Sequence, residues 1–545
     1  MATFLTIYSK SQKVNLSLFS EVISDFTLKG SRNIMHHEFK GMLLYIAKEF
    51  EGNYFESNDS VSFVSGHISF EKIANQEGNT TTEKFDNCLK NGLENTPVLL
   101  EGAFAAIHYN KNTNSLFYLN DKFGLFPLFV FENSEYVILS NEYHPLAQFD
   151  KKINLESIAE FLTLGVTLGS KTFFKNIKNL EPASFVESNG NKTSEKIYWT
   201  PKSNSHKFLN INESARELYE TFKKVNQEYL NEGLTDMCLL TAGADSRLIV
   251  STLTKEQLRH TKFYTSNLSF LDPLQDKDVI GASALASKFT LKHTIEKISF
   301  YENEFNTTYF EKERELRKSQ VYGGWHGGEF LGGYCLKAVP INKQLNYEEV
   351  NSKLKSIFNW RYRFKLKKHP YTSYLEEKEK LNFYGNDLLF QIYQMTRSFF
   401  TNIYGGTRGH WVQPFQLMNH GISPFWDSRL LQLLIQIPIS DLENYSIYNK
   451  VFQYCDKEFT QIPSNSPLTN REDAILPKMD IGIEPKHQIP NTHHKAYKDY
   501  LNNNKMWERK FYNKKSFEKI LVHEFDTTTK QWLDFEVWYS KYFKE

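Results

Sequence analysis

Cysteine is scarce in this sequence and its charges are balanced, and both facts exclude classes of protein. The 545 residues contain four scattered cysteines, with no CxxC pair and no metal-type spacing: Cys88, Cys238, Cys335 and Cys455. Such cysteines are typical of buried free thiols in a reducing compartment. Lysine and arginine number 65 against 64 acidic residues, a net charge of +1. The composition therefore gives no electrostatic case for a nucleic-acid or membrane-surface partner.

The sequence also shows no pattern typical of a targeting segment and no long hydrophobic run. The N-terminal stretch MATFLTIYSKSQ has no charged start followed by an apolar core, so we expect no signal peptide. The most apolar run, LLQLLIQIPI at 430–439, is interrupted by glutamines and Pro438 and is too short to cross a bilayer. These features predict a cytoplasmic protein without a membrane partner.

The length exceeds one ordinary core and predicts at least two domains. Residues up to about 200 consist mainly of short aromatic and β-branched runs separated by turn residues, which is typical of strands. A short helix is predicted at 155–165, where an apolar segment ends at a glycine. The stretch 200–214 is polar and contains a proline. We place the boundary there, which predicts domains at 1–200 and 201–545.

Beyond the boundary, helical and strand patterns alternate. A helix with Asn212 as its N-cap is predicted first, because apolar side chains follow at helical spacing (Leu218, Phe222, Val225 and Tyr229). A strand, a helix, a strand, a helix and a strand follow, at 236–240, 247–253, 262–266, 276–289 and 291–298. This alternation indicates a parallel sheet with crossover helices. From about residue 347 the chain is predicted to be mostly helical.

A loop of small residues separates the first of these strands from the next helix. It consists of Leu240, Thr241, Ala242, Gly243, Ala244, Asp245 and Ser246. Ligands of open α/β sheets bind at the carboxyl ends of the strands, and small residues let backbone N–H groups turn toward an anion. Asp245 could hold a magnesium ion bound to phosphates, and Thr241 and Ser246 could donate hydrogen bonds. The alternative is an ordinary helix cap built from the same Asp and Ser.

Two other patterns are weak as ligand sites. The usual nucleotide loop, GxxxxGK(S/T), is missing from the sequence. GVTLGSKT at 165–172 has its lysine one place late and leads into TFF, which we predict as a strand, so we interpret it as a turn. The histidine pairs 36–37 and 493–494 lack acidic partners at ligand spacing, and we interpret them as surface residues.

Five stretches resemble the asparagine synthetase family, in the family's own order. EGAFAAIHYNKNTNSLFYLNDKFGLFPLFV (101–130) and FLTLGVTLGSKTFFKNIKNLEPASFV (161–186) resemble parts of its N-terminal glutaminase-type domain. TAGADS (241–246) resembles its SGGxDS pyrophosphate loop. HGGEFLGGY (326–334) and SPFWDSRLLQLLIQIP (423–438) resemble its GADELFGGY and PFLD segments. The resemblance extends over nearly the whole chain.

This resemblance implies an α/β fold in two parts. The first is an αββα-layered, class II amidotransferase-like domain, and the second is an α/β parallel-sheet domain of the ATP-pyrophosphatase type. The family's second domain activates a carboxylate as an acyl-adenylate and passes the acyl group to an amine, with ATP and Mg²⁺. Magnesium and backbone N–H groups stabilise the departing pyrophosphate. The implied partners are a small-molecule or peptide carboxylate and an amine, with a homodimer as one option for the assembly.

The chain departs from the family at the residues of glutamine hydrolysis. The family uses a cysteine exposed when the initiator methionine is removed, and this sequence has Ala2, which cannot form a thioester. The Asn-Gly-Glu triplet of the glutamine pocket corresponds to Ser65-Gly66-His67, and its Arg-Gly-Pro motif is not visible. The N-terminal domain is therefore predicted to be an inactive scaffold. Members with the same losses include β-lactam synthetases and lasso-peptide macrolactam synthetases, in which the substrate's own amine attacks.

The synthetase motifs depart as well. The first glycine of SGGxDS is Ala242, and the family's Asp-Glu pair becomes Gly328-Glu329. The resemblance implies that Asp245 and Glu329 hold the metal and that Lys478, in AILPKMDIGIEP, neutralises charge at the reacting groups. Glu329 and Lys478 are thus the predicted catalytic residues. Asp427 is interpreted as structural.

The favoured interpretation is an ATP-dependent, AMP-forming ligase that makes an amide bond without hydrolysing glutamine. A non-catalytic ATP-binding or scaffold homologue is the alternative from another class, because Gly328 removes one acid. The third hypothesis is an ammonia- or glutamine-dependent asparagine synthetase, and Ala2 argues against its glutamine-dependent form.

Overall fold

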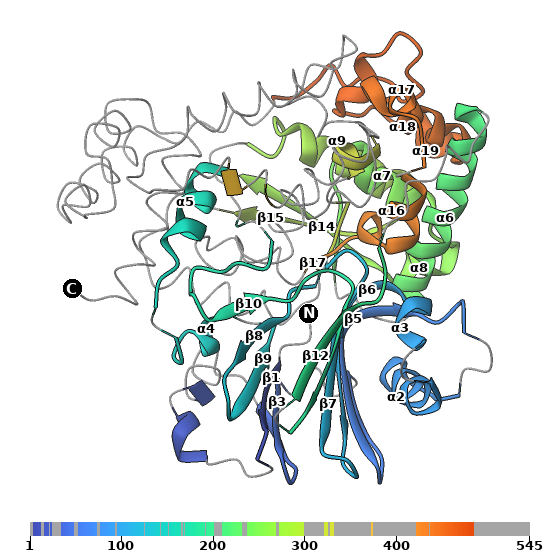
Figure 1. Cartoon of the computed structure of the whole chain (residues 1–545). Coiled ribbons are helices and arrows are strands. Elements are labelled where there is room, and N and C mark those ends of the chain that lie inside the picture. Colours follow the sequence, from blue (N-terminus) through green and yellow to red (C-terminus); the bar gives the residue numbers. More distant parts are fainter. Residues whose placement is uncertain are drawn as a thin grey trace, which may run out of the picture.

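The chain folds into three sheets with helices around them (Figure 1). The structure is a computed structural model, and it describes residues 4–11, 16–20, 22–23, 34–47, 53–73, 77–92, 95–124, 126–141, 143–150, 152–164, 167, 169–190, 192–200, 210–231, 237–268, 272–298, 321–324, 327–331, 372–373, 376, 421–434 and 436–483. Most of the region after 347 that was predicted to be helical lies outside them.

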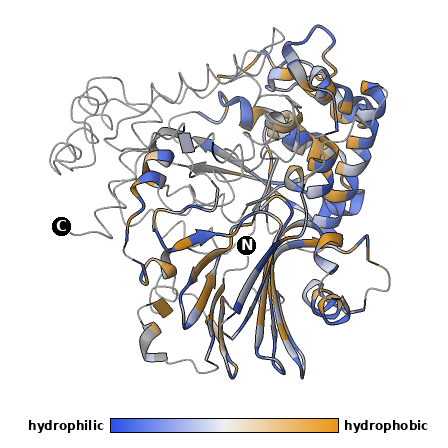
Figure 2. Ribbon diagram, in the orientation of Figure 1, coloured by the Kyte–Doolittle hydropathy of each residue, from blue (hydrophilic) through white to orange (hydrophobic). Residues whose placement is uncertain are grey.

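The N-terminal part contains two six-stranded antiparallel sheets. In spatial order, the first consists of β10 (Ile177–Asn179), β8 (Phe129–Glu132), β9 (Tyr136–Ser140), β1 (Phe4–Ser9), β3 (Met42–Ala47) and β2 (Ile34–Glu38). The second consists of β12 (Lys192–Ile197), β11 (Ser184–Asn189), β7 (Ser115–Asn120), β6 (Glu101–Asn110), β5 (Ser60–Ser69) and β4 (Tyr54–Glu56). Hydrophobic residues lie along the strands of both sheets (Figure 2).

These two sheets pack against each other through one apolar core. Phe4 of β1 and Phe63 of β5 are both fully buried, and their ring centroids lie 5.0 Å apart. A second cluster lies under helix α2 (Thr81–Gly92), whose Phe85 and Leu89 pack with side chains of β5 and β6. Short helices α3 (Thr96–Leu99), α4 (Tyr143–Leu146) and α5 (Leu155–Leu164) complete this part, with a 3-10 turn, η1 (Leu16–Phe19). Layered sheets with helices outside agree with the expected N-terminal architecture.

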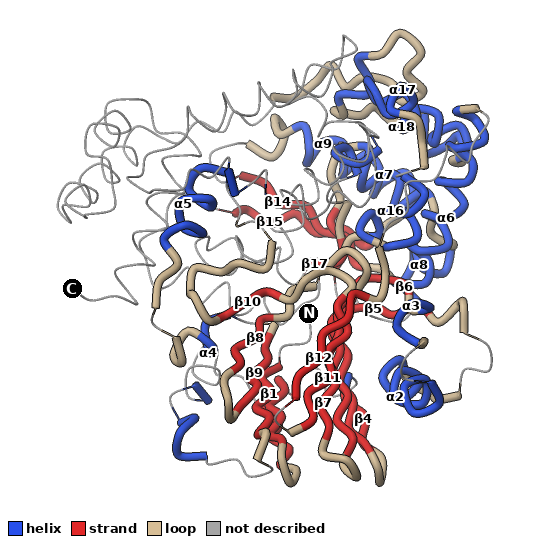
Figure 3. The backbone as a smooth tube through the Cα atoms, in the orientation of Figure 1, coloured by secondary structure: helices blue, strands red, loops and turns tan. Residues whose placement is uncertain are grey.

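The C-terminal part is built on a five-stranded parallel sheet, as the alternating pattern predicted. Its spatial order is β15 (Lys292–Ile298), β14 (Lys262–Leu268), β13 (Met237–Leu239), β16 (Val321–Tyr322) and β17 (Gly421–Ile422). The helices between or before these strands are α6 (Ile211–Asn231), α7 (Ala244–Ser251), α8 (Lys255–His260), α9 (Lys277–Phe289) and α11 (Gly327–Leu331). Figure 3 shows α6, α7, α8 and α9 beside this sheet.

A helical segment follows β17 and packs beside α6. It contains η6 (Pro424–Trp426), α16 (Ser428–Leu434), α17 (Ile439–Leu442), η7 (Glu443–Tyr445), α18 (Ser446–Val451), η8 (Phe452–Tyr454), α19 (Lys457–Thr460) and η9 (Pro467–Asn470). Its apolar residues join the same core cluster that fills the space between the two N-terminal sheets. The two halves of the chain therefore share buried surface. None of the described helices is long and apolar enough to cross a membrane.

Several predicted boundaries are wrong in detail. Helix α6 starts at Ile211, and the side chain of Asn210, not of Asn212, accepts a hydrogen bond from the Glu213 amide at 3.0 Å. The stretch 172–174 contains no strand, only a single bridge from Phe174 to Ile153, and the strand begins later as β10. Residues 201–209 lie outside the described residues, so the exact domain boundary stays a prediction.

Candidate functional site

The small-residue loop lies at the carboxyl end of β13, where the pattern predicted it. Helix α7 begins at Ala244, and its N-cap is Gly243, which has no side chain to bond the first helical amides. Asp245 and Ser246 therefore lie in the first turn of the helix and not on a loop, which corrects the prediction that α7 begins at 247. The alternative that Asp and Ser cap this helix is wrong. A helix without a side-chain cap presents its N-terminal amides and positive dipole end to whatever lies above it.

Hydrogen bonds within the loop fix its shape. The amide of Thr241 donates to Oγ of Ser246 at 3.1 Å, and the amide of Gly243 donates to Oγ1 of Thr241 at 3.1 Å. The two hydroxyl oxygens are themselves 3.1 Å apart. Thr241 and Ser246 thus hold the loop, a role that the sequence did not predict for them.

Ala242 is held from both sides by residues far away in the sequence. Its amide donates to Oδ1 of Asp278 at 3.2 Å, and its carbonyl accepts from Oγ of Ser464 at 2.7 Å and from the amide of Asn465 at 3.2 Å. A Cβ added to Gly281 of α9 would lie 2.3 Å from Cβ of Ala242. A glycine is therefore required at 281 for α9 to approach this loop.

Asp245 faces the glycine-rich segment that resembles GADELFGGY. Tyr448, which is buried on α18, donates a hydrogen bond to Oδ1 of Asp245 at 2.5 Å. A Cβ at Gly327 would lie 2.5 Å from the same oxygen, and one at Gly324 would lie 2.6 Å from Cβ of Asp245. Gly324 and the start of α11 at Gly327 lie against the Asp245 side chain because these two positions carry no side chain of their own.

The structure describes the side chain of one predicted metal ligand, Asp245, but not that of the other, Glu329. A Cβ at Gly328 would lie 4.0 Å from Oδ2 of Asp245, so this position, where the family carries an acid, lies next to the carboxylate. Glu329 lies on α11, but its side chain is outside the described residues. Among the described part of the chain, no group of three or more His, Cys, Asp or Glu side chains is placed to hold a metal ion. The metal assignment of Asp245 and Glu329 stays a prediction.

Lys478 lies close to the loop in the fold. It forms a parallel bridge with Ser464, the residue whose hydroxyl bonds Ala242. Its side chain is exposed and has no hydrogen-bond or ion-pair partner within the described ranges. The next residue, Met479, is buried against α9, where a Cβ at Gly281 would lie 2.9 Å from its Cε. The fold therefore brings the predicted lysine and the predicted phosphate loop to one edge of the sheet.

A buried arginine that the sequence analysis missed supports this arrangement. Arg247 of α7 is fully buried and donates to the carbonyl oxygens of Phe459 (3.0 Å), Pro463 (2.9 Å) and Ile462. Burial lowers the pKa of this guanidinium to about 10. Arg247 ties α7 to the segment that carries Ser464. The sequence signal that could have identified Arg247 was its charge at the start of the apolar run RLIV.

The cysteines behave as predicted where the structure describes them. Cys238 and Cys455 are buried free thiols, and Cys88 is a half-buried one. Burial raises the pKa of Cys238 and of Cys455 to about 12, so neither forms a thiolate at neutral pH. Cys335 lies outside the described residues.

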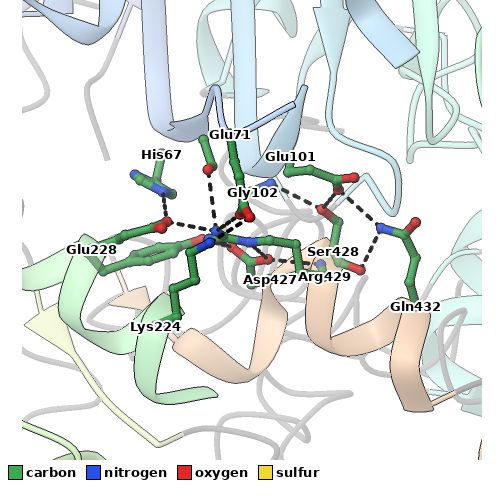
Figure 4. Close-up of polar contacts among 12 residues, drawn as sticks. His67, Glu71, Glu101, Gly102, Lys224, Glu228, Asp427, Ser428, Arg429 and Gln432 are labelled. Atoms are coloured by element: carbon green, nitrogen blue, oxygen red, sulfur yellow. Dashed lines mark hydrogen bonds and ion pairs between the residues drawn. The ribbon is translucent and has the colours of Figure 1, made fainter. Parts of the chain in front are cut away.

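The residues that correspond to the glutamine pocket lie at the junction of the two halves. Ala2 is outside the described residues, whereas Ser65, Gly66 and His67 lie on β5. The buried ring of His67 lies 4.2 Å from the ring of Tyr229 on α6, and its Nε2 lies 3.8 Å from Oε2 of Glu228 (Figure 4). The third residue of the triplet therefore contacts the C-terminal half.

Glu101 is the centre of a second set of contacts across this junction. Oε1 of its fully buried carboxylate accepts from Nζ of Lys122 at 2.6 Å and of Lys72 at 2.5 Å. Oε2 accepts from the hydroxyl of Ser428 at 2.5 Å and from the amide of Gln432 at 3.1 Å, both on α16 (Figure 4). Four donors satisfy this buried charge, two of them from the other half of the chain.

Asp427 is structural, as interpreted from the sequence. It is fully buried and accepts from Nε and Nη2 of Arg429 at 2.8 and 2.9 Å. Burial alone raises its pKa, but the charge and hydrogen bonds of Arg429 outweigh burial and hold the pKa below its ordinary value. The histidine pair at 36–37 lies on β2, with His36 exposed and stacked on Tyr45; the pair at 493–494 lies outside the described residues.

Comparison with known proteins gives the class of the N-terminal part first. Residues 74–199 match the family described as glutamine amidotransferase domain. The chain is also 23% identical over 268 residues to proteins of Mycobacterium bovis and of two Mycobacterium tuberculosis strains, provisionally named asparagine synthetase (glutamine-hydrolyzing). That match covers 45% of this chain and 41% of each relative, so the chain matches less than half the length of these relatives.

Two solved structures are similar at lower levels. One is glutamine phosphoribosylpyrophosphate amidotransferase from B. subtilis, with 10% identity, a TM-score of 0.25, and 49% of this chain and 75% of that chain covered. The other is an allosteric regulatory enzyme of purine biosynthesis, with 10% identity, a TM-score of 0.26, and coverage of 54% and 80%. The family match and the curated relatives support the broad resemblance to asparagine synthetases, and the β-lactam or lasso-peptide subtype stays a prediction.

Proposed function

We propose that the chain is an ATP-dependent ligase that adenylates a carboxylate and transfers the acyl group to an amine without hydrolysing glutamine. The single observation that carries this proposal is the position of Asp245. It lies in the first turn of an uncapped helix at the carboxyl end of a parallel strand, against the glycines of α11. The Lys478 segment joins the same loop through Ser464.

The proposed reaction has two steps. A carboxylate oxygen attacks the α-phosphorus of ATP, the bond from that phosphorus to the bridging oxygen breaks, and pyrophosphate leaves. The amine nitrogen then attacks the acyl carbon, AMP leaves with the former carboxylate oxygen, and the amine loses a proton. A carboxylate is a poor electrophile, so the first step supplies the leaving group that amide formation needs.

The chain's own residues would act mainly by positioning and by charge. The amides at the start of α7 would bind the pyrophosphate, because anions are stabilised at helix N-termini. The exposed ammonium of Lys478 neutralises the charge that develops in both steps. Asp245, held by Tyr448, would be the ligand of a magnesium ion together with Glu329. Bound magnesium supplies charge neutralisation on the phosphates.

Two observations support an amine source other than glutamine. Ala2 cannot supply the nucleophile that a glutaminase of this type needs. His67 replaces the glutamate of the pocket triplet, and its ring is buried against α6. An amine carried by the carboxylate substrate itself would react fastest, because an intramolecular nucleophile has a high effective concentration.

A nucleotide-binding protein without catalysis is the second candidate, and Gly328 favours it. This residue lies beside Asp245 where the family carries an acid, so one carboxylate of the metal site is lost. Pyrophosphate release separates the two candidates. The purified protein is incubated with ATP, magnesium and pools of small carboxylic acids and amines, and pyrophosphate and AMP are measured. Formation of both supports the ligase, whereas ATP binding without either product supports the second candidate.

A further inference from the structure

The guanidinium of Arg429 joins three parts of the molecule. Its Nε and Nη2 donate hydrogen bonds to the Asp427 carboxylate. Its Nη1 donates to Oε2 of Glu228 on α6 at 2.7 Å (Figure 4). The same nitrogen lies 3.3 Å from Oγ of Ser69 and 3.5 Å from Oε2 of Glu71, at the end of β5. One side chain of α16 therefore contacts α6 and the N-terminal half together.

Glu71 carries a second link from the N-terminal half to α6. Its Oε1 lies 2.5 Å from Nζ of Lys224, which is one helical turn before Glu228. The side chain of Glu71 is 46% exposed, whereas that of Arg429 is 10% exposed. The cluster thus has a buried centre and an accessible edge, and the edge is the part contributed by the N-terminal half.

The same turn of α6 supports the phosphate loop from behind. Asn226 donates to the carbonyl of Ile249 at 2.9 Å and to Oγ1 of Thr252 at 2.7 Å, and these residues end α7. Its Oδ1 accepts from the hydroxyl of Tyr322 on β16 at 2.6 Å. The opposite end of α7 is the loop, and β16 leads to Gly324, which packs on Asp245.

We propose that Arg429 is a positioning residue through which the N-terminal half holds α6, and through α6 the phosphate loop. The N-terminal half is then a structural part of the nucleotide site. The proposal rests on the proposed function only for its activity measurement. Its physical basis is a set of contacts in two steps: Ser69 and Glu71 contact Arg429, which bonds Glu228 of α6, and Asn226 of α6 bonds the end of α7. Such networks fix one arrangement of the elements they join.

The edge of the cluster allows a test that leaves its buried centre intact. The double variant Ser69→Ala/Glu71→Ala removes the N-terminal contacts to Arg429 and Lys224 and keeps the Arg429–Asp427–Glu228 contacts. Lys178→Met is the matched control, because Lys178 pairs with Glu195 within the N-terminal half, and both are partly exposed. Arg429→Lys is a second test variant, which keeps the charge and loses the fork.

Amide hydrogen exchange of α7 measures the coupling without any activity. In the full-length double variant we expect amides at 244–252 to exchange at least fivefold faster than in wild type. In Arg429→Lys we expect the same amides to exchange faster still, and in Lys178→Met we expect the wild-type rate. In pyrophosphate exchange we expect KM for ATP to rise about fivefold and kcat to stay within twofold. A purely structural role would lower the unfolding midpoint without this split between KM and kcat.

The outcomes for the two proposals are distinguishable. Unchanged exchange at 244–252 in both test variants overturns the positioning role, whatever the activity. An inactive wild-type protein with faster exchange in the variants supports the positioning role and rejects the proposed ligase. Equal changes in the Lys178→Met control would show a general loss of stability and would overturn the positioning role.

Discussion

The phenol of Tyr448 donates a 2.5 Å hydrogen bond to Oδ1 of Asp245, across 203 positions of sequence. The ring is buried on α18, so the contact fixes the direction in which the carboxylate points. A carboxylate that receives such a bond on one oxygen has its other oxygen directed elsewhere. Oδ2 is the oxygen that faces Gly328.

Tyr448→Phe removes this bond and keeps the ring. If Asp245 is a metal ligand, we expect the variant to fold normally and to need about tenfold more magnesium for ATP binding, because partners that orient a ligand typically contribute 10- to 100-fold in metal affinity. Calorimetric titration of ATP at several magnesium concentrations measures the change. An unchanged magnesium requirement would remove Asp245 from the metal site.

Asp245→Asn tests the phosphate loop itself. We expect loss of ATP–magnesium binding with little change in stability, because Gly243, and not Asp245, is the N-cap of α7. Thr254→Ala is the matched control, since Thr254 forms a complete capping box with Gln257 at the start of α8. That variant should lose about 1 kcal/mol of stability and keep ATP binding. The opposite pattern in the two variants would contradict the assignment.

Gly328→Asp should restore the missing acid. The added Cβ has room, 4.0 Å from Oδ2 of Asp245, so we expect activity to be unchanged or raised at limiting magnesium. Glu329→Gln should lower adenylation on the order of tenfold, which is about 1.4 kcal/mol. Pyrophosphate exchange across a magnesium titration measures both.

The neighbouring glycine provides the control for this pair. A Cβ at Gly327 would lie 2.5 Å from Oδ1 of Asp245 and 2.7 Å from Cζ of Phe425, so Gly327→Ala should damage the site by steric conflict. If Glu329→Gln is silent and Gly328→Asp has no effect at low magnesium, this segment holds no metal and the non-catalytic candidate gains.

The junction between the halves should weaken in acid. Burial alone raises the pKa of Asp427 and of Glu228. The charge and hydrogen bonds of Arg429, with the charge of His67, lower the folded-state pKa of Asp427, and the hydrogen bond of His67, with the charge and hydrogen bond of Arg429, lowers that of Glu228. A lowered pKa stabilises the fold above the unfolded value, about 4 for such groups, and this stabilisation is lost as the pH falls further. Urea unfolding between pH 3 and pH 7 should show declining stability below about pH 4.

Glu228→Gln isolates this contribution. We expect lower stability at pH 7, because the half-buried Glu228 loses the charge that pairs with Arg429, and a shallower decline in acid. Equal slopes for variant and wild type would show that the contact does not titrate with folding. Asp86, which is buried with Ser60, Ser62 and His108 and whose pKa is also lowered, contributes in the same direction in both proteins.

Local patterns predicted the elements around the site well. Helix α9 was expected at 276–289 and runs from Lys277 to Phe289, and the structure shows Asp276 as its N-cap. Helix α7 was placed too late because its cap is a glycine, which the preference for Asp and Ser does not mark. At α6, two asparagines flank Ile211, and the pattern alone could not choose between them.

The contacts that join distant segments could not be predicted from local patterns. Arg429 contacts Glu228 and Ser69 across 201 and 360 positions, and neither neighbourhood carries a motif for it. The resemblance located Asp245 and the glycines of α11 as separate motifs, and only the fold shows that Gly327 touches the Asp245 carboxylate. Long-range pairing depends on the packing of the whole core, which periodicity does not encode.

The glutaminase prediction is tested by incubating the full chain with glutamine. We expect no ammonia or glutamate above a blank, because no thiolate is available at position 2 and the described thiols of Cys238 and Cys455 have raised pKa values. Ala2→Cys tests whether the rest of the pocket survives. We expect it to stay inactive, because His67 fills the junction with α6.

The most direct test of the central claim is pyrophosphate release by the wild-type chain with ATP, magnesium and carboxylic acids, with and without glutamine. We expect pyrophosphate and AMP in equal amounts, no dependence on glutamine, and loss of both products in Asp245→Asn. Hydrolysis of glutamine in step with pyrophosphate release would contradict the claim, and so would release that persists in Asp245→Asn.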